Sequence, residues 1–418
     1  MSAFQLWRLG MARIVDPIGI IALAWLGWQV IFGGSQEFYA HATWIGAIAI
    51  AGCVIDPGVR RNVPVPLLLY LAAMLAAEAG GSAAGGDFRL GAGRPLYSYA
   101  VMVAFIFGVA YLLRTPRRLA WFAIALVAAI TVIGMQLMFD RYETNFPDPR
   151  QTSGWAYQPS VTQWGGLHQS GMLLILALPF VLAPIVVARR LSLIAAASIF
   201  SIALVAAAYI NASRGGVVAM AGVIVGMVFC AVWMRVRDWR VRALSVALLV
   251  LPLLLAVAVI TGRTPIPKPE SASGGRIPIW SAALAMFRDH PWLGVGPGHY
   301  QTVIVSGGYG ARYDPDPSGL RQAHNLLLQV AVETGVVGLA AYSAWWAWML
   351  FATFRHWRND HVAMVSVGLT FALAGFLIRS MTDNFMDGIP TTDRTRVLVW
   401  ALWAAALAVQ RLPRHVDA

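Results

Sequence analysis

The sequence predicts an all-α, polytopic integral membrane protein, and three observations carry that prediction. Hydrophobic residues make up 59% of the 418 residues, charged residues only 12%, and the mean hydropathy is +0.66. Such a chain has too little polar surface to cover a soluble globule. Apolar runs near the length of about 20 residues that a bilayer requires recur about twelve times. Short arginine-rich segments separate them on alternate sides.

The apolar runs are predicted to be helices, because an open sheet edge cannot satisfy its backbone groups in hydrocarbon. The first run follows Arg13 without a small-residue cleavage site, so we expect a retained helix rather than a signal peptide. The predicted spans are 17–33, 39–55, 64–79, 98–113, 118–138, 169–187, 191–211, 216–234, 243–261, 335–354, 362–380 and 397–410.

Arginine placement predicts the orientation of the chain. By the positive-inside rule, the short basic segments are cytoplasmic, which places both termini inside and predicts a multi-pass inner-membrane protein. The opposite segments carry most of the acidic residues and the only long loops, 139–168 and 262–324. We therefore expect a functional site on the face away from the cytoplasm. The cytoplasmic arginines are Arg8, Arg13, Arg60, Arg61, Arg114, Arg117, Arg118, Arg189, Arg190, Arg235, Arg237, Arg240, Arg242, Arg355, Arg358, Arg411 and Arg414.

The net charge of +12 does not indicate nucleic-acid binding, because the basic residues are dispersed and form no single-faced stripe. Of the 31 basic residues only Lys268 is a lysine. Arginine grips phosphate with a planar fork, so this usage suits membrane lipids or a phosphate ligand. Cys53 and Cys230 lie in apolar runs without metal-ligand spacing. No metal or cofactor is expected.

Three regions are expected along the chain. Residues 1–190 hold helices one to six with the loop 139–168, and residues 191–354 hold the catalytic region with the large loop 262–324. Residues 355–418 hold helices eleven and twelve. The glycine-rich stretch from Gly80 to Gly93 is predicted to be an exterior loop.

The loop 139–168 is rich in aromatic and amide side chains. Trp and Tyr form belts at membrane boundaries, whereas aromatic faces and amides also bind glycans, and both interpretations stay open. His168 begins the helix that follows and is a candidate substrate-binding residue. In the next exterior turn, Arg214 precedes two glycines that allow a ligand close approach. Its alternative is a snorkelling anchor.

Within the large loop, apolar residues at helical spacing predict a helix from Arg276 to His290, ended by Pro291, with its apolar face on the membrane or the helix bundle. The run Gly294 to Tyr300 predicts a tight turn. It is no nucleotide-binding loop, because no strand precedes it and no Gly-Lys-Ser or Gly-Lys-Thr follows. Asp314 and Asp316 have the spacing of a metal-binding acid pair, but such a pair alone in a proline-rich loop is usually solvated, so we expect no metal there.

The chain re-enters a helix at 321–325, where His324 lies three residues after Arg321. A lone histidine is more often structural than catalytic. At a helix start, however, a neutral imidazole could act as a base.

Three motifs in order resemble the O-antigen ligase and polymerase superfamily of bacterial membrane glycosyltransferases. They are Ser213-Arg214-Gly215, the stretch from Gly275-Arg276 through Trp280 to Pro291 and Gly298, and Ala323-His324-Asn325 continuing to Glu333-Thr334-Gly335 and Leu339. The resemblance implies a membrane-embedded glycosyltransferase of the GT-C type that uses a glycan on undecaprenyl diphosphate. It places Arg214, Arg276 and His324 at the positions of functional residues.

The chemistry of these residues agrees with the resemblance. Two arginines can stabilise a departing diphosphate through bidentate hydrogen bonds without a metal. His324 can take the proton of an attacking sugar hydroxyl. We expect direct displacement with inversion, because no exterior carboxylate pair suggests a covalent intermediate. Candidate substrate-binding residues are Arg321, His299, His168, Ser213 and Asn325, and loop positions without function are the alternative for Arg321 and His299.

Among the family members, we expect a ligase that joins O-antigen to lipid A-core. A polymerase that extends the chain on its lipid carrier is the alternative. The protein-glycosylating branch is less expected, because the chain stops at Ala418, shortly after the last predicted span. A lipid-linked glycan transporter is a third possibility, but it would place ionisable groups near the bilayer midplane in paired repeats, which the sequence lacks.

Overall fold

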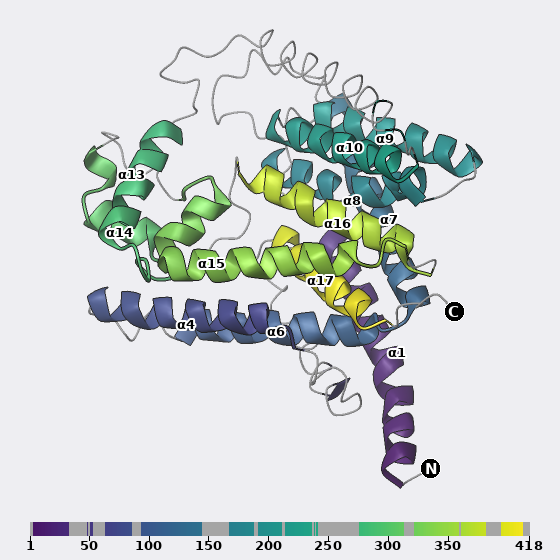
Figure 1. The fold of residues 1–418 in the computed structure, drawn as a ribbon, viewed down its shortest axis with the longest axis horizontal. Helices are drawn as coiled ribbons and strands as arrows, with labels where there is room; N and C mark the ends of the chain where they lie inside the picture. Colours follow the sequence, from purple (N-terminus) through teal and green to yellow (C-terminus); the bar gives the residue numbers. More distant parts are fainter. Residues whose placement is uncertain are drawn as a thin grey trace. The chain divides into compact units, whose positions relative to one another are not determined.

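Every regular element that the computed structural model describes is helical, as predicted (Figure 1). The described residues are 3–32, 48, 51–52, 63–85, 93–143, 167–187, 191–210, 214–235, 238, 240, 276–312, 322–358, 361–381 and 394–412. The predicted span 243–261 lies outside them, as does most of 39–55.

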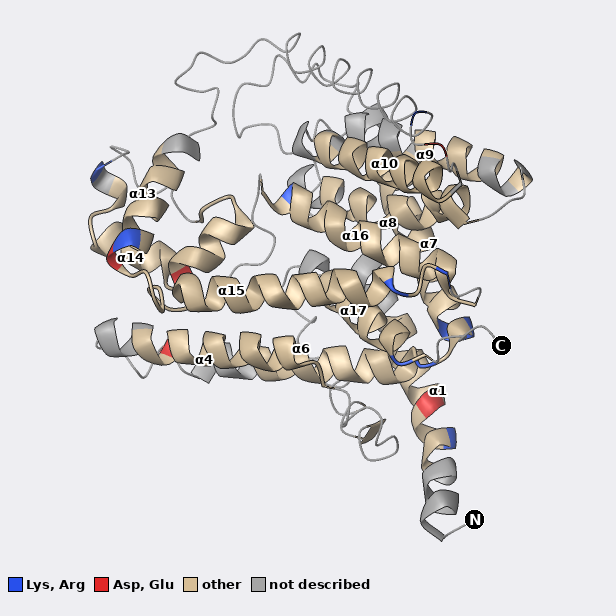
Figure 2. Cartoon of the chain, viewed as in Figure 1, with Lys and Arg blue, Asp and Glu red and all other residues tan. Residues whose placement is uncertain are grey.

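Each of the other predicted spans coincides with a described helix. Most of the described helical residues are neither basic nor acidic (Figure 2). Among the described residues, the segments 116–136, 326–354 and 363–380 are long and apolar enough to cross a membrane. The prediction of a helical membrane protein is thus confirmed, while the count of twelve spans stays a prediction. The helices are α1 (Ala3–Phe32), α4 (Val65–Gly85), α6 (Gly93–Leu112), α7 (Pro116–Glu143), α8 (Leu167–Val187), α9 (Leu191–Ile210), α10 (Arg214–Arg235), α15 (Leu326–Phe354), α16 (Ala363–Ser380) and α17 (Arg394–Gln410).

The glycine-rich stretch is shorter as a loop than predicted. Helix α4 continues to Gly85, and α6 begins at Gly93. The prediction of a loop from Gly80 onward is therefore wrong for the last turn of α4. The residues after Gly81 include Ala83 and Ala84, and alanine is the strongest helix former.

The chain divides into two compact units. The first comprises 1–118, 273–352 and 380–413, and the second comprises 119–272, 353–379 and 414–418. In the first unit α6 contacts α1, α4 and α17, and in the second α8 contacts α9 and α10. The three-region division along the sequence stays a prediction.

Aromatic side chains fix α15 within the first unit. The ring of Tyr342 lies 5.4 Å from that of Tyr70 on α4. Trp345 and Trp346 meet Trp403 of α17 edge to face, with ring centroids 5.7 Å and 5.6 Å apart. Edge-to-face pairs add roughly 0.5–1.5 kcal/mol each beyond the area they bury. These contacts hold α15 to both α4 and α17.

An ion-pair cluster ties α1 to the turn between α6 and α7. Arg114 donates to both oxygens of Asp16, at 3.0 Å and 2.7 Å, and Arg118 donates to Asp16 Oδ2 at 2.9 Å. Arg114 also lies 4.3 Å from the centre of the Tyr111 ring. Burial alone would raise the pKa of the Asp16 carboxyl, but the two guanidinium groups outweigh burial and lower it.

We expect Asp16→Asn to lower the free energy of unfolding at neutral pH by roughly 1.5–3 kcal/mol, the worth of hydrogen bonds to a charged group. Because the pKa of Asp16 is lowered in the folded state, its stabilisation is present above the unfolded pKa and is lost as pH falls through the folded pKa. Thermal unfolding of both proteins in detergent measures this. Their melting temperatures should differ near pH 7 and converge below the ordinary range of Asp. A pH-independent difference would contradict the prediction.

Helix α15 is interrupted at Gly335, whose φ of 63° and ψ of −168° are not helical. In an unbroken helix, the carbonyls of Val332 and Glu333 would accept from Val336 and Val337. Here Val295 N donates to the Val332 carbonyl and Gly296 N to the Glu333 carbonyl, both at 2.9 Å.

The partners released by the interruption are also used. Val336 N donates to the Pro291 carbonyl at 2.8 Å and Val337 N to that of Trp292 at 3.4 Å. The segment Pro291–Gly296 therefore lies between the two halves of α15 and replaces two helical hydrogen bonds with four. Non-helical backbone in a membrane protein is tolerated where other protein groups satisfy it in this way.

Candidate functional site

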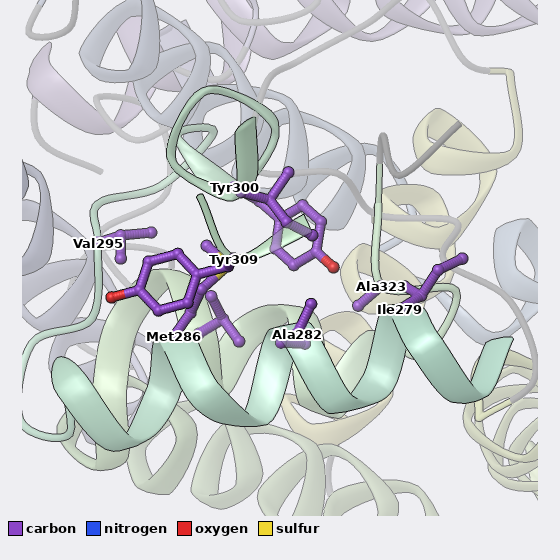
Figure 3. Packing of buried hydrophobic residues seen from close by; sticks show 10 residues of the cluster. Ile279, Ala282, Met286, Val295, Tyr300, Tyr309 and Ala323 are labelled. Carbon is purple, nitrogen blue, oxygen red and sulfur yellow. The ribbon is translucent and has the colours of Figure 1, made fainter. Parts of the chain in front are cut away.

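The predicted loop helix exists and packs on the protein. Helix α13 runs from Arg276 to Asp289 and contacts α14 (Tyr300–Ser306) and the 3-10 helix η3 (Gly310–Arg312). Its apolar face lies in a buried cluster with Val295, Tyr300, Tyr309 and Ala323 (Figure 3). This apolar face is therefore buried against the protein itself, chiefly against the rest of the large loop and against Val332 of α15. The members of α13 in the cluster are Ile279, Ala282, Ala283 and Met286.

One hydrogen bond brings the beginning of α13 to the segment that carries His324. The indole Nε1 of Trp280 donates to the Ala323 carbonyl at 2.9 Å. Ile279 and Ala323 also belong to the same buried cluster (Figure 3). Arg276, the first residue of α13, lies one helical turn before Trp280. Two of the three predicted catalytic positions therefore lie on segments in direct contact.

His324 occupies a fixed backbone corner. Its φ is 48°, and it is the one non-glycine residue with positive φ in the described part of the chain. Such conformations cost free energy and persist where the surroundings determine them. On one side Ala323 N donates to Gln329 Oε1 at 2.8 Å. On the other side Asn325 Nδ2 donates to the Met381 carbonyl at 3.2 Å.

The helix start near His324 differs from the predicted one. Residues 322–325 are not helical, and α15 begins at Leu326. The physical reason is a cap, because Asn325 Oδ1 accepts a hydrogen bond from Leu328 N at 3.1 Å. Asparagine favours this position ahead of the first helical residue. Asn325 thus has a structural role, and its contact with substrate stays a prediction.

Tyr309 fixes the other end of α13. Its hydroxyl donates to Asp289 Oδ2 at 2.7 Å, and Arg312 lies 5.5 Å from the centre of its ring. Burial raises the pKa of the Tyr309 phenol, and the bond to Asp289 raises it further. The phenol therefore stays a neutral donor that holds η3 to α13.

His299 lies in the turn predicted between α13 and the next helix. Glycines with positive φ at 294, 296 and 298 build this turn, so the prediction of a tight turn is confirmed. His299 precedes α14, and its Nδ1 is buried without a hydrogen-bond partner among the described residues. Its role in substrate binding stays a prediction.

The other predicted site residues are placed by their helices alone. Arg214 is the first residue of α10 and His168 the second residue of α8, both in the second unit. Ser213 and Arg321 lie outside the described residues. The structure therefore places Arg276 and His324 on segments of the first unit that are in contact through Trp280 and Ala323, and describes Arg214 by itself in the second unit.

Sequence reasoning assigned no role to Trp280, Gln329 or Glu333, although all three fall inside the recognised motifs. Gln329 and Glu333 are polar residues one helical turn apart among apolar ones, and this spacing could have identified the pair. Within the described ranges, no group of three His, Cys, Asp or Glu side chains could hold a metal ion.

Two comparisons place the chain among known proteins. Residues 199–343 match the family model described as O-antigen ligase. This range contains Arg214, Arg276 and His324. The chain is also 28% identical to an O-antigen ligase of Pseudomonas aeruginosa over 192 residues, which are 43% of this chain and 42% of that protein. The matched region thus spans less than half the length of the curated relative. The motifs and both matches agree, and residues 199–343 of this chain are similar to the O-antigen ligase family.

Proposed function

We propose that this protein is an O-antigen ligase, which transfers a glycan from undecaprenyl diphosphate to a sugar hydroxyl of lipid A-core. The observation that carries the proposal is the His324 corner, held on both sides by hydrogen bonds and tied through Trp280 to the start of α13. In the proposed topology, about twelve spans with both termini in the cytoplasm place this corner on the periplasmic face of the inner membrane. The fold is of the membrane-embedded GT-C type.

The proposed reaction is a direct displacement at the anomeric carbon. A lone pair of the acceptor hydroxyl forms the new glycosidic bond while the bond to the diphosphate oxygen breaks. The hydroxyl proton passes to His324, and the electron pair leaves with undecaprenyl diphosphate. Arg276 and Arg214 stabilise the charge that develops on the diphosphate, and two charge-assisted contacts there suffice without a metal. The product has inverted anomeric configuration.

Complementation tests the function. A ligase-deficient Gram-negative strain with the cognate core should regain its lipopolysaccharide ladder on gels when it expresses the wild type. Arg276→Ala and Arg214→Ala should each lose the ladder at matched expression, a drop on the order of 10²–10³-fold for one removed transition-state donor. Arg288→Ala is the matched control, because this exposed arginine lies in the last turn of the same helix as Arg276.

The outcomes separate the candidate functions. A ladder with the wild type and Arg288→Ala, but with neither site variant, supports the ligase. A well-expressed wild type that gives no ladder, although polymer and core are present, contradicts it and favours a polymerase using the same donor. Counterflow of labelled lipid-linked glycan in vesicles would favour a transporter instead.

A further inference from the structure

A buried polar chain leads from the interior of α15 to the His324 corner. Gln329 and Glu333 lie one helical turn apart, with only 3% and 4% of their surfaces exposed. Gln329 Nε2 donates to Glu333 Oε1 at 2.7 Å, and Gln329 Oε1 accepts from Ala323 N at 2.8 Å. Ala323 is bonded directly to His324 in the chain. The residue beside the candidate base is therefore held by a side chain from the helix core.

The two partners fix the direction of the Gln329 amide. A glutamine amide has one donor end and one acceptor end, and Glu333 Oε1 accepts from the donor end. Glu333 therefore turns the NH₂ end of Gln329 toward itself and the Oε1 end toward the Ala323 N–H. Without Glu333, the amide could rotate and present its NH₂ to another N–H, which is repulsive.

The hydrogen-bonded pair Gln329–Glu333 lies among buried residues. Tyr300 and Val332 belong to the buried cluster around it, and Tyr300 has 1% of its surface exposed. Burial raises the pKa of the Tyr300 phenol, and the negative charge of Glu333 raises it further. Hydrogen bonds are stronger in such a low-dielectric site, and an unsatisfied group there is costly. The interior thus enforces a single arrangement of the chain.

We infer that Gln329 and Glu333 are positioning residues for His324, in which the carboxylate orients the amide and the amide holds the backbone of the corner that presents the imidazole. The inference rests on the proposed function, since it assigns His324 as the base. The alternative is that Gln329 and Glu333 only stabilise the start of α15 and do not affect the His324 imidazole.

A swap of the two side chains tests the orientation directly. Gln329→Met keeps a side chain of similar length but removes both hydrogen bonds. The kcat of this variant should fall on the order of 10²-fold, as for a small misplacement of a reacting group. Glu333→Gln leaves the direction of the Gln329 amide undefined, and its kcat should fall less than that of Gln329→Met. In the double variant Gln329→Glu/Glu333→Gln, one carboxylate oxygen at position 329 can accept from Ala323 N–H. The other oxygen can accept from the amide NH₂ at position 333. This double variant should recover most of the activity.

Tyr309→Phe is the matched control. It also removes a side-chain hydrogen bond of 2.7 Å made by a member of the buried cluster, but this bond runs from the residue before η3 to the exposed Asp289 at the end of α13 and does not touch the His324 corner. Activity is measured per folded protein with purified lipid-linked O-antigen and rough lipopolysaccharide. The KM values should change little in all variants, and Gln329→Met alone should alter the pH profile of kcat.

A second readout needs no transfer activity. Diethyl pyrocarbonate modifies the His324 imidazole, and mass spectrometry gives the rate for each protein. Gln329→Met should change this rate, while Tyr309→Phe and the double swap should match the wild type. The inference is overturned if Gln329→Met equals Tyr309→Phe in kcat, pH profile and modification rate, or if the swap recovers nothing although it folds. A wild type inactive in transfer would defeat only the proposed function, since the modification rates still decide the positioning.

Discussion

Replacing His324 with glycine is expected to abolish glycan transfer while leaving the protein folded. His324 is the candidate base, and losing a positioned base costs roughly 10²–10⁴-fold in rate. Its φ of 48° is a conformation that glycine adopts without the steric cost of a Cβ. The two hydrogen bonds made by Ala323 and Asn325 do not involve the imidazole and remain available in this variant.

Stability and activity should therefore separate in this variant. Relief of the left-handed backbone conformation offsets the entropy that glycine loses on folding, so the free energy of unfolding should be unchanged or higher by up to about 1 kcal/mol. His324→Asn is the matched comparison, because asparagine also tolerates positive φ and keeps a polar group but cannot act as a base. Transfer per folded protein and thermal unfolding in detergent measure the two quantities.

Either of two results would contradict this prediction. If His324→Gly retained transfer near the wild-type rate, the imidazole would not be the base, whatever its position. If His324→Gly unfolded while His324→Asn did not, the side chain would be holding the corner and not the reverse. Loss of transfer by both folded variants would support the catalytic assignment free of any effect on folding.

Local sequence patterns predicted the elements that local physics determines. The periodicity of α13 and its end before Pro291 were predictable, because apolar spacing and the missing proline N–H act within one helix. Apolar runs likewise located the spans. The end of α4 was not predictable in this way, because the glycines there suggested a loop while the alanines beside them continue the helix.

The contacts that build the candidate site were less predictable, because they join segments far apart in the chain. The motif glycines suggested a tight turn, but nothing local shows that Gly294 packs against the interruption at Gly335. His324 was recognised, yet its left-handed corner depends on Gln329, Trp280 and Asn325 together. Sequence reasoning thus proposed candidate site residues and missed the groups that hold the His324 corner.

Gly335→Ala and Gly294→Ala are each expected to prevent stable folding, with a loss above about 4 kcal/mol, the extreme of single substitutions. At Gly335, φ 63° and ψ −168° form a combination open essentially to glycine alone. A Cβ there would overlap the backbone of Trp292, and one at Gly294 would overlap the backbone around Glu333. Backbone atoms cannot move aside as the end of a side chain can, so the four hydrogen bonds of the interruption would break together.

Gly308→Ala separates the cost of a positive φ from the cost of a Cβ that overlaps neighbouring backbone. Gly308 also has a positive φ, of 69°, but a Cβ there would meet nothing within 4 Å. It should cost only the backbone conformational term, roughly 1–2 kcal/mol. Folded yield by fluorescence-detected gel filtration, followed by thermal unfolding, ranks the three variants. If Gly335→Ala or Gly294→Ala were as mild as Gly308→Ala, the segment Pro291–Gly296 would not be held between the halves of α15, and these motif glycines would need an explanation in substrate binding instead of folding.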